Sequence, residues 1–188
     1  MLSRAIFLAS LAGAIVLAPS SVDAAGRPSK AAHLIGIAAT HAAEADHPVM
    51  DLPPGLRRQV LCTALNVYHE ARGSTRRDQT GVALVTRNRA LHERRSYCSV
   101  VWERAQFSWT RHRVRRLIPR DDAAWDRALT RAMVVVAAPG PRDITRGARH
   151  FYNPRLVRPR WARPGKVVSA RRIGQHRYVR LRDARWYE

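Results

Sequence analysis

The apolar side chains between residues 56 and 71 repeat with the period of an α-helix. They fall on one broad face and stand at positions 56, 60, 61, 64, 65, 67, 68 and 71. The preceding stretch "DLPPG" contains two prolines and a glycine, which commonly stand just outside a helix. We therefore expect a long helix that begins near Leu56, with Glu70 at the border of its apolar face.

The same pattern predicts further helices downstream. One covers about residues 78–92. Another opens at Asp121 and Asp122, whose charges suit the positive end of a helix, and stops before "PGP" at 139–141. Between these helices, "SYCSVVWE" predicts a short helical turn or two, and "AQFSWT" at 105–110 predicts an irregular aromatic loop.

The last third of the chain has no helical period and is rich in proline, arginine and aromatic residues. The stretches "KVVSA" and "HRYVRL" predict short strands, because polar and apolar side chains alternate in the second of them. The fold class that we expect is therefore α+β, mostly α, with loops and short strands in its C-terminal part.

The N-terminal stretch "MLSRAIFLASLAGAIVLAPSSVDA" has the layout of a secretory signal peptide cleaved after Ala24. The alternative is a permanent anchor helix. However, the apolar run from Ala5 to Ala18 is shorter than the roughly 20 residues of a membrane span. We expect a signal peptide over 1–24, a linker or disordered arm over 25–51 and one folded domain over 52–188, with export to the periplasm, the cell envelope or the medium.

The chain is strongly basic, with 34 Lys and Arg against 14 Asp and Glu and a formal net charge of +20. Such a charge attracts polyanions, including nucleic acids, anionic lipids and acidic cell-envelope polymers. We do not expect a nucleic-acid partner, because the export signal opposes one and the motifs of the common nucleic-acid-binding folds are missing.

Cys62 and Cys98 are the two cysteines of the chain. An exported protein meets an oxidising compartment, so the pair could form a disulfide. The residues alone also allow two buried free thiols.

The usual metal, phosphate and nucleophile motifs are missing. The dipeptide "HE" at 69–70 does not continue as HExxH, and neither a glycine-rich phosphate loop nor a GxSxG motif is present. What remains is Glu70, together with aromatic, amide and hydroxyl side chains that suit the flat faces and hydroxyl rims of sugars. These candidate binding residues are Tyr68, Gln106, Phe107, Ser108, Trp109, His150 and Phe151, and core packing is the alternative for each aromatic ring.

The motifs "LCTALNVYHEARG", "DQTGVALVTRNR", "YCSVVWE", "AQFSWT", "GARHFYNP" and "IGQHRYVR" appear in an order that resembles the SleB-type cell wall hydrolases. The resemblance implies a domain like goose-type lysozyme and the lytic transglycosylases over 52–188. It also implies that Glu70 is the catalytic acid/base and that Cys62 and Cys98 are bridged. The implied substrate is peptidoglycan, and we expect a monomer with no cofactor, no metal and no permanent membrane span.

Two positions depart from the family pattern. Ser74 stands where relatives commonly have a second acidic residue, and Arg149 stands where many have threonine. A single carboxyl group favours a lytic transglycosylase, which forms 1,6-anhydro ends, over a muramidase-type hydrolase of the same bond. The chain could also be a non-catalytic envelope-binding protein, or a metal-dependent peptidase that uses His69, His150 or His176.

Overall fold

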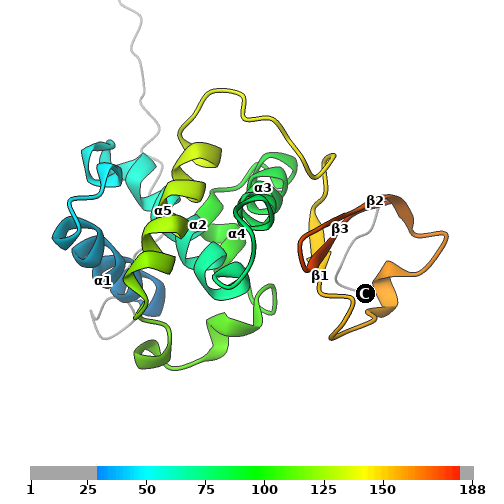
Figure 1. Cartoon of the computed structure of the whole chain (residues 1–188), viewed down its shortest axis with the longest axis horizontal. Coiled ribbons are helices and arrows are strands. Elements are labelled where there is room, and N and C mark those ends of the chain that lie inside the picture. Colours follow the sequence, from blue (N-terminus) through cyan, green and yellow to red (C-terminus); the bar gives the residue numbers. More distant parts are fainter. Residues whose placement is uncertain (1–28, 183–188) are drawn as a thin grey trace, which may run out of the picture.

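The computed structural model describes residues 29–182 and shows a helical body with a small sheet at one side (Figure 1). The predicted class, α+β and mostly α, is confirmed. The α-helices of this part of the chain are α1 (Lys30–Glu44), α2 (Pro54–Ala71), α3 (Arg76–Glu93), α4 (Tyr97–Val101) and α5 (Asp122–Val136). Its 3-10 helices are η1 (Pro48–Asp51), η2 (Ser108–Arg111), η3 (Val114–Arg116) and η4 (Arg160–Ala162). The predicted signal peptide at 1–24 lies outside the described residues.

Helix α1 lies within the stretch that we predicted to be a linker or disordered arm, and the structure corrects this prediction. Ser29 caps the helix, because its side-chain oxygen accepts a hydrogen bond from the backbone N–H of Ala32 at 3.2 Å. One face of α1 is buried in the same core as the other helices, through Leu34, Ile35, Ala38 and Ala42. The sequence signal was weak because small alanines make up much of this face.

Helix α2 is buried along most of its length, because α3, α4 and α5 pack around it (Figure 1). Every residue from Val60 to Tyr68 is buried, including the polar Asn66. The Asn66 amide donates to Thr86 Oγ1 at 3.2 Å and accepts from Trp109 Nε1 at 3.0 Å, so burial leaves it satisfied. Glu70 lies in the last turn of α2, where it and His69 are half-buried.

The disulfide that the family resemblance implied is present and joins α2 to the short helix α4. Cys62 Sγ and Cys98 Sγ are 2.08 Å apart, and the bridge spans 36 positions of the chain. A loop of this length corresponds to a stabilisation of roughly 4 kcal/mol in the chain-entropy model. The bridge therefore ties the segment that follows α3 back to the central helix.

The sheet contains strands β1 (His150–Tyr152), β2 (Val167–Ile173) and β3 (His176–Leu181), in the antiparallel order β1-β3-β2. Strands β2 and β3 overlap the two predicted strands, whereas β1 was not predicted. Tyr178 on β3 is fully buried and lies against α3 at Gly81. A Cβ at Gly81 would come within 2.5 Å of Tyr178 Cζ, so only glycine permits this close packing of sheet on helix.

The structure also bears on membrane association. Within residues 29–182, no helix combines the length and the apolar character that are needed to cross a bilayer.

Candidate active site

Glu70 lines a cavity of about 520 Å³ between the helical body and the sheet. One wall, here called the helical wall, consists of Glu70 at the end of α2 and Val85 and Arg89 on α3. The facing wall, here called the loop wall, consists of residues 104–108, Arg111, residues 149–151 and Trp161. The cavity thus assembles distant parts of the sequence around one carboxyl group.

Glu70 is half-buried, and this burial raises the pKa of its carboxyl group above the ordinary value. An electrostatic interaction with His176 acts in the opposite direction and lowers the pKa of Glu70, but burial prevails. Glu70 therefore keeps its proton to a higher pH than a solvated glutamate does. This is the property that a general acid requires.

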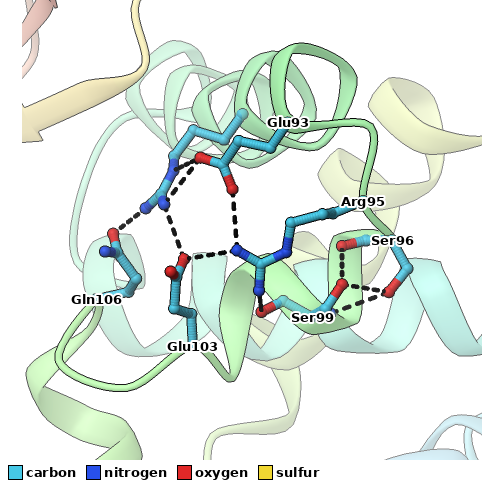
Figure 2. Close-up of polar contacts among 7 residues, drawn as sticks. Glu93, Arg95, Ser96, Ser99, Glu103 and Gln106 are labelled. Carbon is cyan, nitrogen blue, oxygen red and sulfur yellow. Dashed lines mark hydrogen bonds and ion pairs between the residues drawn. The ribbon is translucent and has the colours of Figure 1, made fainter. Parts of the chain in front are cut away.

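Arg89 is the buried centre of an ionic network behind the cavity. Its side chain is 4% exposed, and its Nη2 lies 3.1 Å from Glu93 Oε1 and 2.9 Å from Glu103 Oε2. Arg95 joins the same two carboxylates, at 3.1 Å from Glu93 and 3.2 Å from Glu103 (Figure 2). The charge of Arg89 is thus compensated inside the protein, as a buried charge requires.

The same arginine also positions one predicted binding residue. Arg89 Nη1 donates a hydrogen bond to the side-chain oxygen of Gln106, which links α3 to the loop wall. The rings of Phe107 and Phe151 stack with centroids 6.3 Å apart and join the two halves of that wall. The residues that the sequence predicted at 106–108 and at 150–151 therefore meet in space.

His150 also lies in the loop wall, and its electrostatic state follows from its surroundings. Burial lowers the pKa of His150 to about 3, and the positive charges of Arg89 and Arg149 add to the effect. His150 is therefore neutral near pH 7, and it enters hydrogen bonding as an uncharged ring.

Two of the predicted binding residues do not line the cavity. Tyr68 is buried, and its hydroxyl oxygen accepts hydrogen bonds from the backbone N–H groups of Arg120 at 3.1 Å and Asp121 at 3.3 Å. Trp109 is buried too, donates to Asn66 as described above, and stacks on His69 with ring centroids 4.5 Å apart. Both aromatic rings serve core packing, which was the alternative that the sequence left open for them.

His69, the residue before Glu70, is anchored by a hydrogen bond to the backbone of another segment. Its Nε2 lies 3.0 Å from the Leu117 carbonyl oxygen, and because that oxygen can only accept, Nε2 carries the hydrogen. Burial lowers the pKa of His69 to about 4, so the ring is neutral near pH 7. His69 is thus held in place by a backbone bond and adds no charge beside Glu70.

A buried cluster beside the site was not predicted from the sequence. His176 Nδ1 lies 3.1 Å from Asp78 Oδ2, and the Tyr178 hydroxyl donates to Asp78 Oδ1 at 2.7 Å. Burial alone would raise the pKa of Asp78, but the hydrogen bonds from His176 and Tyr178 outweigh it and lower the pKa. Asp78 stands near the start of α3, and its partners are 98 and 100 positions away along the chain.

The turn between β2 and β3 fits tightly over this cluster. Gly174 has φ +56°, and a Cβ there would come within 2.8 Å of the Asp78 side chain. The next backbone N–H, of Gln175, donates to Asp78 Oδ2 at 3.3 Å. The motif "IGQHRY" therefore contained a signal from which the cluster could have been predicted. It combines a glycine turn with two alternating polar side chains, His176 and Tyr178, that face inward.

A metal site was not predicted. Within residues 29–182, no group of three or more His, Cys, Asp or Glu side chains is arranged so that it could hold a metal ion.

Comparison with known proteins assigns a family to this architecture. The sequence model described as Cell Wall Hydrolase matches residues 73–179, more than half of the chain. The matched range contains α3, the loop wall and all of the sheet except the end of β3, and it begins three positions after Glu70. No curated protein and no solved structure gives a significant match. The chain belongs to the cell wall hydrolase family, as the motifs predicted.

Proposed function

We propose that this protein cleaves the glycan strands of peptidoglycan as a lytic transglycosylase, with Glu70 as its single acid/base. The family assigns the chain to enzymes that act on peptidoglycan. The observation that carries the choice of residue is the half-buried carboxyl group with a raised pKa in a cavity of about 520 Å³. A half-buried glutamate in the last turn of a central helix also supports the lysozyme-like architecture that we expect.

The proposed reaction takes place at the bond between N-acetylmuramic acid and N-acetylglucosamine. Protonated Glu70 donates its proton to the glycosidic oxygen, and the bond from that oxygen to C1 of the muramic acid breaks. The ionised Glu70 then accepts the proton of the C6 hydroxyl while O6 bonds to C1. The products are a 1,6-anhydro end and a new N-acetylglucosamine hydroxyl, and Glu70 has regained its proton.

The lack of a second suitable carboxyl group supports this mechanism over hydrolysis. A hydrolase commonly uses two carboxyl groups, about 5–5.5 Å apart for retention and about 6.5–9.5 Å apart for inversion. Among the cavity-lining residues, all within 29–182, Glu70 is the only one with a carboxyl group. The Asp78 oxygens are occupied by His176, Tyr178 and the Gln175 N–H, so that carboxylate is not available to activate water.

The basic surface suggests how the enzyme stays on its substrate. Arg172 and Arg177 are exposed and directly opposite each other on the β2–β3 hairpin, where like charges repel. Arg180 and Arg182 are exposed as well. We infer that the hairpin binds anionic envelope polymers and that the enzyme works outside the cytoplasm after export.

The test is mass spectrometry of muropeptides released from purified peptidoglycan by residues 25–188, beside a Glu70→Gln variant. We expect 1,6-anhydro muropeptides from the wild type alone, with both proteins folded by circular dichroism. Reducing ends in the wild-type digest would mean a muramidase-type hydrolase. Equal digests from both proteins would contradict the role of Glu70, and no release from either would favour a binding protein.

A further inference from the structure

The cavity has an unusual charge balance. It is lined by one carboxyl group, that of Glu70, and by the four arginines Arg89, Arg104, Arg111 and Arg149. Arg89 is neutralised by Glu93 and Glu103. By contrast, Arg104, Arg111 and Arg149 form no ion pair with any acidic side chain in the described part of the chain. An excess of positive charge therefore faces the space in which a substrate would bind.

These three arginines converge on the cavity from different segments. Arg104 lies between α4 and η2, Arg111 ends η2, and Arg149 immediately precedes β1. Arg104 and Arg111 are exposed, whereas Arg149 is half-buried, with its Nη2 donating to the Leu181 carbonyl oxygen at 3.5 Å. Charges of one sign that line a concave site focus the electrostatic field and raise the local concentration of an oppositely charged ligand.

The chemistry of arginine narrows the identity of that ligand. Sugar hydroxyls and N-acetyl groups are neutral, and amide or hydroxyl side chains suffice to bind them. A guanidinium group is suited to carboxylates and phosphates, which it binds through paired charge-assisted hydrogen bonds. In a peptidoglycan glycan, the anionic group nearest the cleaved bond is the one on C3 of the muramic acid, two carbons from C1.

We propose that Arg104, Arg111 and Arg149 form an anion subsite that binds a carboxylate carried by the C3 substituent of the muramic acid at the cleaved bond; this inference rests on the proposed function. The carboxylate belongs either to the lactyl group itself, where no peptide is attached, or to the stem peptide. In both cases the enzyme selects glycans with a charged substituent over glycans in which that substituent is neutral. A bound carboxylate also adds negative charge near Glu70 and so favours its protonated form.

The test measures binding without turnover, in a Glu70→Gln background. Three fluorescently end-labelled soluble glycans serve as probes: strands with stem peptides, strands freed of peptide, and peptide-free strands whose lactyl carboxylates are amidated. Fluorescence polarisation gives the dissociation constant of each. We expect the amidated strands to bind about tenfold more weakly than the charged ones.

The arginines are tested by Arg104→Gln with Arg111→Gln, which are both exposed and can be changed without disturbing the core. Because only Arg149 is left in the subsite, this variant should lose most of the preference for charged over amidated strands. Arg142→Gln is the matched control, because Arg142 does not line the cavity and also lies on a loop, between α5 and β1. If the control loses as much affinity as the subsite variant, or if amidation has no effect on the parent protein, the subsite is disproved.

The same probes separate this inference from the proposed function. If the protein that retains Glu70 binds strands in a charge-dependent way but does not cleave them, the anion subsite is supported and the proposed transglycosylase activity is disproved. If the protein cleaves charged and amidated strands equally well, the proposed activity is supported and the anion subsite is disproved. Tighter binding of peptide-bearing than of peptide-free strands assigns the carboxylate to the stem peptide. Tighter binding of the peptide-free strands assigns it to the lactyl group, whose carboxyl group is an amide where a peptide is attached.

Discussion

The two walls of the cavity differ in how they are built and in what they carry. The helical wall belongs to elements of the core. Glu70 follows the buried stretch of α2, and the side chain of Arg89 is 4% exposed with its charge compensated by glutamates. The loop wall consists of short segments whose arginines are exposed or half-buried and whose aromatic rings are buried or half-buried. We therefore propose that the two walls have different roles. The helical wall carries the proton donor, and the loop wall selects the substrate.

The largest expected effect is on the helical wall. Glu70→Gln removes the proton donor while keeping the shape of the side chain, so we expect kcat to fall by about 10³-fold. The thermal unfolding midpoint should change little, because the side chain is not part of the core. Turnover of purified peptidoglycan together with a thermal melt checks both statements. A variant that keeps most of its activity would move the chemistry away from this wall.

The pH profile sharpens the same point. Because burial raises the pKa of Glu70 and the acid form is the active one, activity should persist above the pH at which a solvated glutamate ionises. It should then fall as the pH rises through the raised pKa. The residual activity of Glu70→Gln should lack this decline. A decline that the variant shares would assign it to another group.

The next largest effect is on stability, at the buried Asp78 cluster that connects α3 to the sheet. Asp78→Asn weakens the bonds to His176 and Tyr178, and we expect a loss of about 2–3 kcal/mol in the free energy of unfolding at pH 7. Urea unfolding measures this loss, and Asp51→Asn, which changes an exposed carboxylate, is the control.

The pH dependence of this loss has a definite sign. The pKa of Asp78 is lowered in the folded state, so its stabilisation is complete above the unfolded pKa of about 3.9. It disappears as the pH falls through the lower folded value. The difference between wild type and Asp78→Asn should therefore shrink in acid, and a constant difference would contradict the assignment.

A smaller effect is expected where the sheet packs on α3. Gly81→Ala would force a Cβ to within 2.5 Å of Tyr178 Cζ, so we expect destabilisation by about 1–3 kcal/mol. Gly36→Ala in α1 is the control, because no atom lies within 4 Å of its new Cβ. That change should stabilise the helix by about 0.5–1 kcal/mol. Equal effects of the two substitutions would show that the sheet is not tightly docked.

The smallest effect is on the loop wall. Gln106→Ala removes one hydrogen-bond partner of Arg89 but leaves its two carboxylates, so the fold should survive. We expect KM to rise about fivefold, which corresponds to about 1 kcal/mol, with little change in kcat. A fall in kcat of the size seen for Glu70→Gln would break the proposed division between the walls.

Local pattern was sufficient to predict much of the helical wall. The apolar period of residues 56–71 predicted α2 and placed Glu70 at its border, and Asp121 does cap the helix that we predicted there. The loop wall was predicted only in part. Strand β1 is three residues long and half-buried at each position, so it carries no alternation from which to recognise it.

The sequence by itself therefore determined most of the helices, the candidate acid and the family, because each depends on nearby residues or on short motifs. The family resemblance implied the Cys62–Cys98 bridge, which the structure contains. Tertiary structure alone decided which aromatic rings face the substrate space, and it sent Tyr68 and Trp109 into the core. Tertiary packing also brings Asp78 into contact with His176 on β3, 98 positions away, and places arginines from separate segments in the cavity that contains Glu70. The physical reason is that periodicity fixes which face a side chain is on, whereas its partners depend on how distant segments pack.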